Sequence, residues 1–191
     1  ERTVLNFMQR LCGIATITDA YIKEIAGTGA RLLDTRKTTP GWRELEKKAV
    51  RDGGGFNHRL GLYDAIMVKD NHLAANPNPI DLAAKIAGIK ASTPGLKIEV
   101  EADNLNQVRC FLPIPGIDVI LLDNMSHREL IEAVSLRSEI APQVVLEASG
   151  GVTLSTIRAI AETGVDYISV GALTHSVRSI DLGLDLIPAN E

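Results

Sequence analysis

The sequence contains few cysteines and no long hydrophobic segment. Cys12 and Cys110 are its only cysteines and form no CxxC pair, so neither a disulfide framework nor a thiolate metal site is supported. We expect both to be buried, reduced thiols. The apolar runs are short, residues 118–123 being typical, whereas a bilayer span needs about 18 residues or more. No basic and then apolar leader opens the chain. We therefore expect a cytoplasmic protein.

Positive charge is not in excess either. The chain has 20 lysines and arginines against 24 aspartates and glutamates, a formal net charge of −4. It therefore has no overall basic field to hold a nucleic acid or an anionic membrane, and any anion site must be local. The HExxH, Walker A and GxGxxG motifs are also missing, which removes the main sequence support for zinc proteases, P-loop enzymes and standard dinucleotide binders.

The overall composition is typical of one globular domain. The 191 residues are 45% hydrophobic and 23% charged, which fits a single buried core. No linker or low-complexity tract divides the chain, so we expect one domain over residues 1–191. Glu1 lies inside a helical pattern, and we expect that something N-terminal to it has been removed.

Strand-like segments alternate with helical ones six times along the chain. The opening helical pattern runs from Val4 to Ile25 and ends at Gly27. Further on, Ser126 starts a capping box, and we expect Thr153 to cap a helix that continues to Gly164. The expected strands are 31–34, 65–69, 97–101, 118–123, 144–147 and 167–170.

The pattern within the strands predicts the fold class. Residues 119–122 are apolar on both faces, which a strand with one face in water cannot be. We therefore expect parallel strands covered by helices, the α/β class. Periodicity alone leaves open whether the sheet is doubly wound or closes into a barrel.

Each expected strand ends in polar or glycine residues. In parallel α/β folds ligands bind beyond the carboxyl ends of the strands, so these endings should share one site. Polar strand ends often arise by chance, but six of them around a common rim are harder to explain that way. In chain order the endings are Asp34-Thr-Arg-Lys37, Lys69-Asp-Asn-His72, Glu101, Asp123-Asn124, Ser149-Gly-Gly151 and Gly171-Ala172.

The early endings indicate a polyanionic ligand. They supply Arg36, Lys37 and Lys69, with His58 and Arg59 between them. Guanidinium groups suit bidentate binding of carboxylate or phosphate.

The later endings indicate a phosphorylated sugar. Glu101 and Asp123 can accept from sugar hydroxyls or hold Mg²⁺, which usually arrives with phosphates. The glycine loops at 149–151 and 171–172 precede helices and offer N–H groups to a phosphate. A pair of such loops after the last two strands favours a barrel over an open sheet.

Each of these residues also has a plain structural interpretation. Lys69 can be a solvated strand end, His58 a hydrogen-bonded structural histidine, and Glu101 the partner of a lysine. The glycines at 53–55 can be a helix stop, although we favour a loop of close approach. We expect Glu99 and Glu147 to point away from the site or to pair with helices; His72, His127 and His175 lack metal-ligand spacing.

Several longer motifs lie at or beside these strand ends and at the start of the chain. They are ERTVLN (1–6), DTRKT (34–38), GGFNHRL (54–60), KDNH (69–72), LLDN (121–124), EASGG (147–151) and GVDYISVGALTH (164–175). Together, and in this order over essentially the whole chain, they closely resemble the quinolinate phosphoribosyltransferase family, the decarboxylating enzymes of NAD synthesis. That family carries an additional N-terminal α/β domain, which we do not find in this sequence, so we expect the barrel domain alone, an incomplete TIM-like barrel of about six parallel strands.

The resemblance implies phosphoribosyl transfer from phosphoribosyl pyrophosphate to quinolinate, giving nicotinate mononucleotide, pyrophosphate and CO₂, with Mg²⁺ as cofactor. It implies catalytic roles for Lys37, Lys69, Glu101 and Asp123, the last two also as Mg²⁺ ligands, and a supporting role for His58. Arg2 would reach a neighbouring subunit's site, which implies a homodimer or larger. The implied substrate-binding residues are Arg2, Thr35, Arg36, Lys37, His58, Arg59, Lys69, Glu101, Asp123, Ser149, Gly150, Gly151, Val170, Gly171 and Ala172, the last six binding the 5-phosphate through backbone N–H groups.

Three alternatives stay open. The same scaffold can serve another carboxylated aromatic acid. This chain can also be an inactive barrel fragment that retains only phosphate binding. A phosphosugar isomerase barrel would share the glycine loops, but it has no need of so many cations.

Overall fold

The computed structural model describes residues 1–69 and 79–185. Its strands form one all-parallel, six-stranded sheet in the order β1-β6-β5-β4-β3-β2. The strands are β1 (Arg31–Leu33), β2 (Ala65–Val68), β3 (Lys97–Ala102), β4 (Val119–Asp123), β5 (Val145–Ser149) and β6 (Tyr167–Ser169). Every predicted strand is therefore present.

The sheet is a barrel that is open at one seam. Consecutive strands from β2 to β6 are neighbours and β1 pairs with β6, but no pairing joins β1 to β2. At the β1 edge the backbone of Phe56 bonds to the sheet instead: its N–H donates to Leu32 O at 2.9 Å and its carbonyl accepts from Asp34 N–H at 3.1 Å. The expected incomplete barrel is confirmed.

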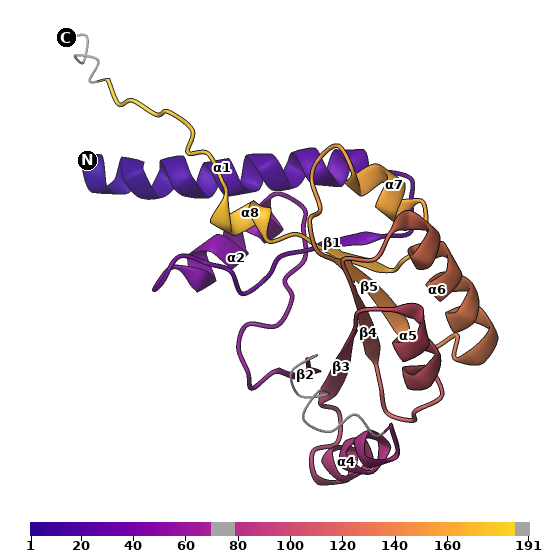
Figure 1. The fold of residues 1–191 in the computed structure, drawn as a ribbon. Helices are drawn as coiled ribbons and strands as arrows, with labels where there is room; N and C mark the ends of the chain where they lie inside the picture. Colours follow the sequence, from indigo (N-terminus) through magenta and orange to yellow (C-terminus); the bar gives the residue numbers. More distant parts are fainter. Residues whose placement is uncertain (70–78, 186–191) are drawn as a thin grey trace.

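The helices follow the strands in sequence and cover the outside of the sheet. Figure 1 shows α4 to α7 along one face, with α1 crossing beyond β1 beside α2 and α8. No helix in the described part of the chain is long and apolar enough to cross a membrane. The helices are α1 (Arg2–Glu24), α2 (Arg43–Asp52), α4 (Pro79–Ser92), α5 (Leu105–Phe111), α6 (His127–Ile140), α7 (Ile157–Ala161) and α8 (Ala172–His175).

The hydrophobic core lies between the helices and the outer face of the sheet. Ile98, Ile120, Leu146 and Ile168 are fully buried there. Because side chains alternate along a strand, the residues between them face the barrel interior, and many of these are polar. The expected parallel strands covered by helices are therefore confirmed, although the interior face of the sheet is more polar than residues 119–122 alone indicate.

The structure tests two predicted helix starts, at Ser126 and at Thr153. Ser126 forms the predicted capping box, its hydroxyl accepting from Glu129 N–H at 3.4 Å while Glu129 Oε2 accepts from Ser126 N–H at 2.8 Å. The predicted Thr153 cap was wrong, because α7 begins only at Ile157. The Thr153 hydroxyl lies 3.0 Å from the Thr156 hydroxyl, so these side chains hydrogen-bond each other and delay the helix.

Two further expectations concern small residues. Gly53 is a point of close approach, since a Cβ atom there would lie 2.4 Å from Ala15 O in α1. Both cysteines are free, but Cys12 is only partly buried and Cys110 is exposed. The expectation that both are buried was wrong: Cys110 lies on the outward side of α5.

Candidate active site

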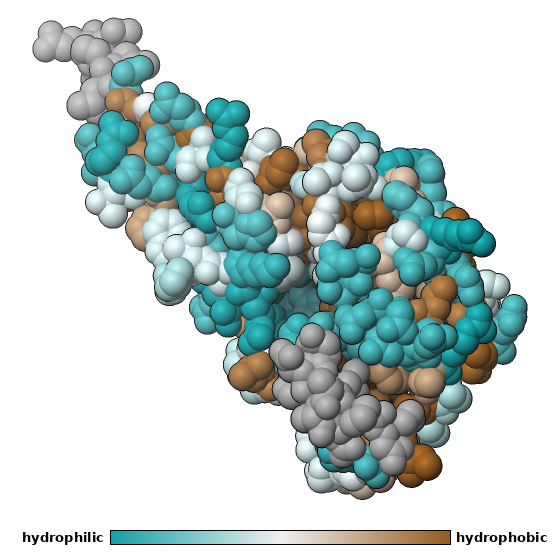
Figure 2. Space-filling model, in the orientation of Figure 1, coloured by the Kyte–Doolittle hydropathy of each residue, from teal (hydrophilic) through white to brown (hydrophobic). Residues whose placement is uncertain are grey.

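A cavity of about 640 Å³ lies at the carboxyl ends of the strands. Figure 2 shows a hollow with largely hydrophilic surroundings on this side of the molecule. Every residue that the family resemblance implies as substrate-binding, except Arg2, lines the cavity, whereas Arg2 is exposed on the first turn of α1. Residues 70–72, predicted as part of the site, lie outside the described residues. The lining includes Thr35, Arg36, Lys37, His58, Arg59, Lys69, Glu101, Asp123, Ser149, Gly150, Gly151, Val170, Gly171 and Ala172.

Four cations, Arg36, Lys37, Arg59 and Lys69, form what we call the cationic wall of this cavity. Within the described ranges, Arg36, Lys37 and Arg59 form no ion pair. Burial and then the like charge of Arg36 lower the pKa of Arg59. Two guanidinium groups held close together without a carboxylate between them favour an anionic ligand.

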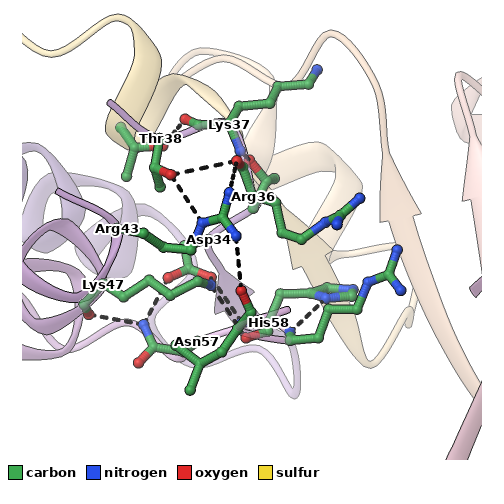
Figure 3. A network of polar contacts seen from close by, with 12 residues as sticks. Asp34, Arg36, Lys37, Thr38, Arg43, Lys47, Asn57 and His58 are labelled. Carbon is green, nitrogen blue, oxygen red and sulfur yellow. Dashed lines mark hydrogen bonds and ion pairs between the residues drawn. The ribbon is translucent and has the colours of Figure 1, made fainter. Parts of the chain in front are cut away.

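A buried acid fixes the backbone of this wall. Asp34, at the end of β1, accepts from Lys47 Nζ, from Asn57 Nδ2 at 2.7 Å and from His58 N–H at 2.8 Å (Figure 3). Burial raises the pKa of Asp34, while Lys47 and the other donors oppose that rise. Asp34 thereby ties the segment carrying His58 and Arg59 to the strand that precedes Arg36.

Hydrogen bonds from α2 also connect the two loops that carry the cationic wall. Arg43 donates from Nε to Thr38 Oγ1 and from Nη1 to Leu60 O, both at 3.1 Å. The Arg36 and Lys37 side chains extend away from this network (Figure 3). The loops are therefore held by their backbone and by buried partners, which leaves those two charged ends for a ligand.

Carboxylates occupy another part of the rim. Oxygen atoms of Glu101, Asp103 and Asp123 lie within 4.8 Å of one another, and we call these residues the acidic rim. Lys69 Nζ lies 2.6 Å from Glu101 Oε2, which is the lysine pairing considered from the sequence. This contact also places the end of β2 against the end of β3. An all-oxygen set of this kind fits Mg²⁺.

The glycine loops close the cavity on the β5 and β6 side. Gly150 has φ +95°, and a Cβ atom there would lie 2.2 Å from Asn124 Oδ1, so no other residue fits without displacement. Among the described residues, the N–H groups of Gly150, Gly151 and Ala172 donate no hydrogen bond. The N–H of Val170, expected to bind phosphate, donates instead to Leu33 O at 2.9 Å.

The prediction for Glu99 and Glu147 was wrong, because both point into the barrel. His58 Nε2 lies 3.2 Å from Glu99 Oε2 and 3.4 Å from Glu147 Oε1. The side chains of the two glutamates are only 6% and 2% exposed. The reason is strand alternation: Glu99 shares a face with Glu101, and Glu147 shares a face with Ser149. We call His58, Glu99 and Glu147 the His58 cluster.

The two glutamates favour the protonated form of His58. Burial lowers the pKa of His58, but hydrogen bonds to Glu147 and Glu99 and their charges outweigh it and raise the value to about 10. Burial also raises the pKa of Glu99. His58 Nδ1 accepts from the backbone N–H of Arg59 at 2.8 Å, so Nε2 is the ring nitrogen that faces the two carboxylates.

Sequence reasoning missed several residues that line the cavity. Met67, Leu121, Glu147 and Ser169 all do so. The first three each precede a predicted site residue by two positions, and Ser169 precedes Gly171 in the same way. The two-residue period of a strand was the signal that could have found them.

Taken together, the fold and site define a class: an α/β-barrel protein with a cavity lined by cations, carboxylates and glycine loops at the carboxyl ends of its strands. Comparison with known families then gives the particular one. Residues 14–185 match the family described as "Quinolinate phosphoribosyl transferase, C-terminal domain". The chain belongs to this family, as the resemblance predicted.

Curated relatives agree with this assignment. The chain is 49% identical over 186 residues to the carboxylating nicotinate-nucleotide pyrophosphorylase of Mycobacterium leprae, covering 97% of this chain and 64% of that protein. It is 45% identical over 192 residues to a probable enzyme of the same name from Bacillus subtilis, covering 100% and 64%. The chain thus spans about 64% of the length of these relatives.

Solved structures have the same fold. The nicotinate-nucleotide pyrophosphorylase of Ehrlichia chaffeensis superposes with a TM-score of 0.87 at 43% identity, over 97% of this chain and 65% of that one. NadC from Streptococcus pyogenes gives a TM-score of 0.85 at 43% identity, over 95% and 61%.

Proposed function

We propose that the protein transfers the phosphoribosyl group of phosphoribosyl pyrophosphate to quinolinate and releases pyrophosphate and CO₂, giving nicotinate mononucleotide. The observation that carries this proposal is one cavity that combines the cationic wall, the acidic rim and the glycine loops. Two polyanions repel each other until cations neutralise them, so holding them side by side is much of the catalytic task.

Quinolinate occupies the cationic wall in this proposal. Its two ring carboxylates lie against Arg36, Arg59 and Lys69, with His58 beneath them. Lys37 lies between quinolinate and the phosphoribosyl donor and contacts both. The absence of an ion pair at Arg36 and Arg59 among the described residues supports this placement.

The phosphoribosyl donor occupies the acidic rim and the glycine loops. Glu101 and Asp123 accept from the ribose hydroxyls, and together with Asp103 their oxygens fit Mg²⁺, which would neutralise the pyrophosphate. Loss of pyrophosphate leaves positive charge on the anomeric carbon, which Glu101 or Asp123 stabilises. The ring nitrogen of quinolinate then attacks that carbon.

The 5-phosphate is held by backbone groups. The N–H groups of Gly150, Gly151 and Ala172 are available for it. Thr35, Ser149 and Gly171 line the same cavity and complete the contacts that we propose.

A second subunit completes the site in this proposal. Arg2 lies outside the cavity of its own chain, and we propose that it enters a neighbour's site in a homodimer or larger assembly. We also propose a cytoplasmic protein, although relatives from rice and tobacco are named chloroplastic and mitochondrial.

Calorimetric titration with quinolinate, and with phosphoribosyl pyrophosphate plus Mg²⁺, tests the proposal, followed by CO₂ release with both present. Saturable binding of both with CO₂ release is the expected result. Lys69→Ala should abolish turnover and leave the fold intact. Binding of the donor without quinolinate would point to a fragment that needs the rest of the protein, and preference for another aromatic acid to a related enzyme.

A further inference from the structure

One buried side chain connects the cationic wall to a glycine loop. Thr174, in α8, is fully buried, and its hydroxyl donates to the backbone carbonyl of Lys37 at 2.7 Å. The two residues are 137 positions apart in the chain. Because Thr174 follows the glycine loop at 171–172, this hydrogen bond joins the segment after β6 to the segment after β1.

The hydroxyl of Thr174 favours this distant acceptor over a local one. Its oxygen lies 3.3 Å from the carbonyl oxygen of Gly171, three residues earlier, but 2.7 Å from that of Lys37. A threonine in a helix commonly donates to the carbonyl three or four residues before it, and a hydroxyl has one proton to donate. The shorter distance assigns that proton to the Lys37 carbonyl.

The Lys37 side chain also packs against the glycine loop. A Cβ atom at Gly171 would lie 3.2 Å from Lys37 Cδ, so the missing side chain at this position makes room for the lysine stem. The N–H of Lys37 donates to Thr35 Oγ1 at 3.1 Å. The backbone and stem of Lys37 are therefore held, while its ammonium end extends away from the surrounding network (Figure 3).

A salt bridge behind Thr174 holds the same two segments. Arg10 of α1 donates from Nη2 to the carbonyl oxygen of Thr174 at 2.7 Å and pairs with Glu46 Oε1 at 3.0 Å. Glu46, fully buried in α2, also accepts from the backbone N–H of Thr39 at 3.0 Å. Because this second connection does not use the Thr174 hydroxyl, we expect the fold to tolerate removal of that hydroxyl.

We propose that Thr174 is a positioning residue for Lys37: its hydroxyl holds the lysine against the glycine loop, where one ammonium group contacts both substrates. This inference rests on the proposed function, in which Lys37 lies between quinolinate and the phosphoribosyl donor. Without the hydroxyl, the Lys37 backbone loses its direct hydrogen bond to the donor side of the cavity. The ammonium group then no longer keeps a fixed position between two anions that repel each other, which slows their reaction.

The first test compares Thr174→Val with Thr174→Ser on a preparation of the protein that turns over quinolinate. Valine keeps the shape of the side chain and removes the hydroxyl, whereas serine keeps the hydroxyl. We expect kcat to fall about 10-fold or more in Thr174→Val, since a misplacement of about 1 Å can cost ~10²-fold. Thr174→Ser should keep kcat near the wild-type value.

Thr163→Val is the matched control. Thr163 is also buried, and its hydroxyl donates to the carbonyl of Ile160 at 2.7 Å, but it lies just after α7 and does not line the cavity. This variant should lower the urea midpoint of unfolding about as much as Thr174→Val does, and it should leave kcat unchanged.

A double-mutant cycle with Lys37→Ala separates the positioning of Lys37 from a general role in the fold. Its readout is the affinity for phosphoribosyl pyrophosphate plus Mg²⁺, measured by calorimetry, because this measurement needs no turnover. Thr174→Val should weaken that binding when Lys37 is present and should weaken it no further in the Lys37→Ala background.

The outcomes distinguish failure of this inference from failure of the proposed function. If Thr174→Val and Thr163→Val affect kcat alike, or if Thr174→Val weakens donor binding equally with and without the Lys37 side chain, Thr174 only supports the fold and the inference is overturned. If the wild-type protein neither binds the donor nor releases CO₂, the proposed function itself has failed. Should Thr174→Val not fold, Thr174→Ala removes the same hydroxyl and is judged by the same two comparisons.

Discussion

The buried ion pair beneath the site yields the sharpest prediction about stability. Lys47 and Asp34 have side chains only 1% and 0% exposed. In Lys47→Met, a side chain of similar length without charge leaves the Asp34 carboxylate buried with only Asn57 Nδ2 and His58 N–H as donors. Removing one partner of a buried pair costs about 3–5 kcal/mol. We expect the free energy of unfolding to fall by that amount.

The next residue along α2 gives a matched control. Lys48 pairs with Asp52 four residues on, but these side chains are 62% and 54% exposed. An exposed pair of this kind contributes about 0.3–0.5 kcal/mol. Lys48→Met should therefore change the free energy of unfolding by less than about 0.5 kcal/mol, although it removes the same charge from the same helix.

Urea unfolding followed by circular dichroism measures both changes at pH 7. The double variant Asp34→Asn with Lys47→Met removes both charges and should recover most of the loss. The cost of Lys47→Met should also shrink as pH falls, because burial raises the pKa of Asp34, and a carboxyl with a raised pKa favours the folded state at low pH. If Lys47→Met costs no more than Lys48→Met, the reasoning from burial is refuted.

Three further predictions concern the site. His58 has a pKa of about 10 against an ordinary value of 6.5, so stability should fall as pH rises between these values, by up to about 1.4 kcal/mol per pH unit; urea titrations should show no such slope in His58→Gln. Gly150→Ala should weaken calorimetric binding of phosphoribosyl pyrophosphate but not of quinolinate; equal weakening of both would contradict the role of this loop. Arg59→Ala should weaken calorimetric binding of quinolinate, by about 2 kcal/mol or more, but not that of phosphoribosyl pyrophosphate. Wild-type kinetics in this variant would contradict the proposal that the cationic wall binds quinolinate.

Strand positions were predictable from the sequence because they depend on local pattern. Short apolar runs such as 119–122, bounded by polar ends, located every strand, and the parallel arrangement followed from their composition. The seam between β1 and β2 was not predictable in this way. Which edges pair depends on contacts between segments distant in the chain, here the backbone of Phe56 bonding to Leu32 and Asp34.

The buried residues that support the site could not be predicted from the sequence either. Lys47 lies in a helix between charged neighbours and looks like a surface residue, because the sequence does not show that Asp34 lies opposite it. The delayed start of α7 is similar: Thr153 fits a cap, but the nearby Thr156 hydroxyl competes for its hydrogen bonds. In both cases a second side chain decided the outcome.

The error on Glu99 and Glu147 has a different origin. A strand period of two places them on the same face as Glu101 and Ser149, so their orientation could have been predicted from the sequence. The expectation failed because burying two carboxylates in a barrel interior is unfavourable unless a partner compensates. That partner, His58, comes from the segment between α2 and β2, in which Phe56 bonds to the β1 edge at the open seam. The open seam is therefore part of the site, because the segment that bonds to the β1 edge there also supplies His58 and Arg59 to the cavity.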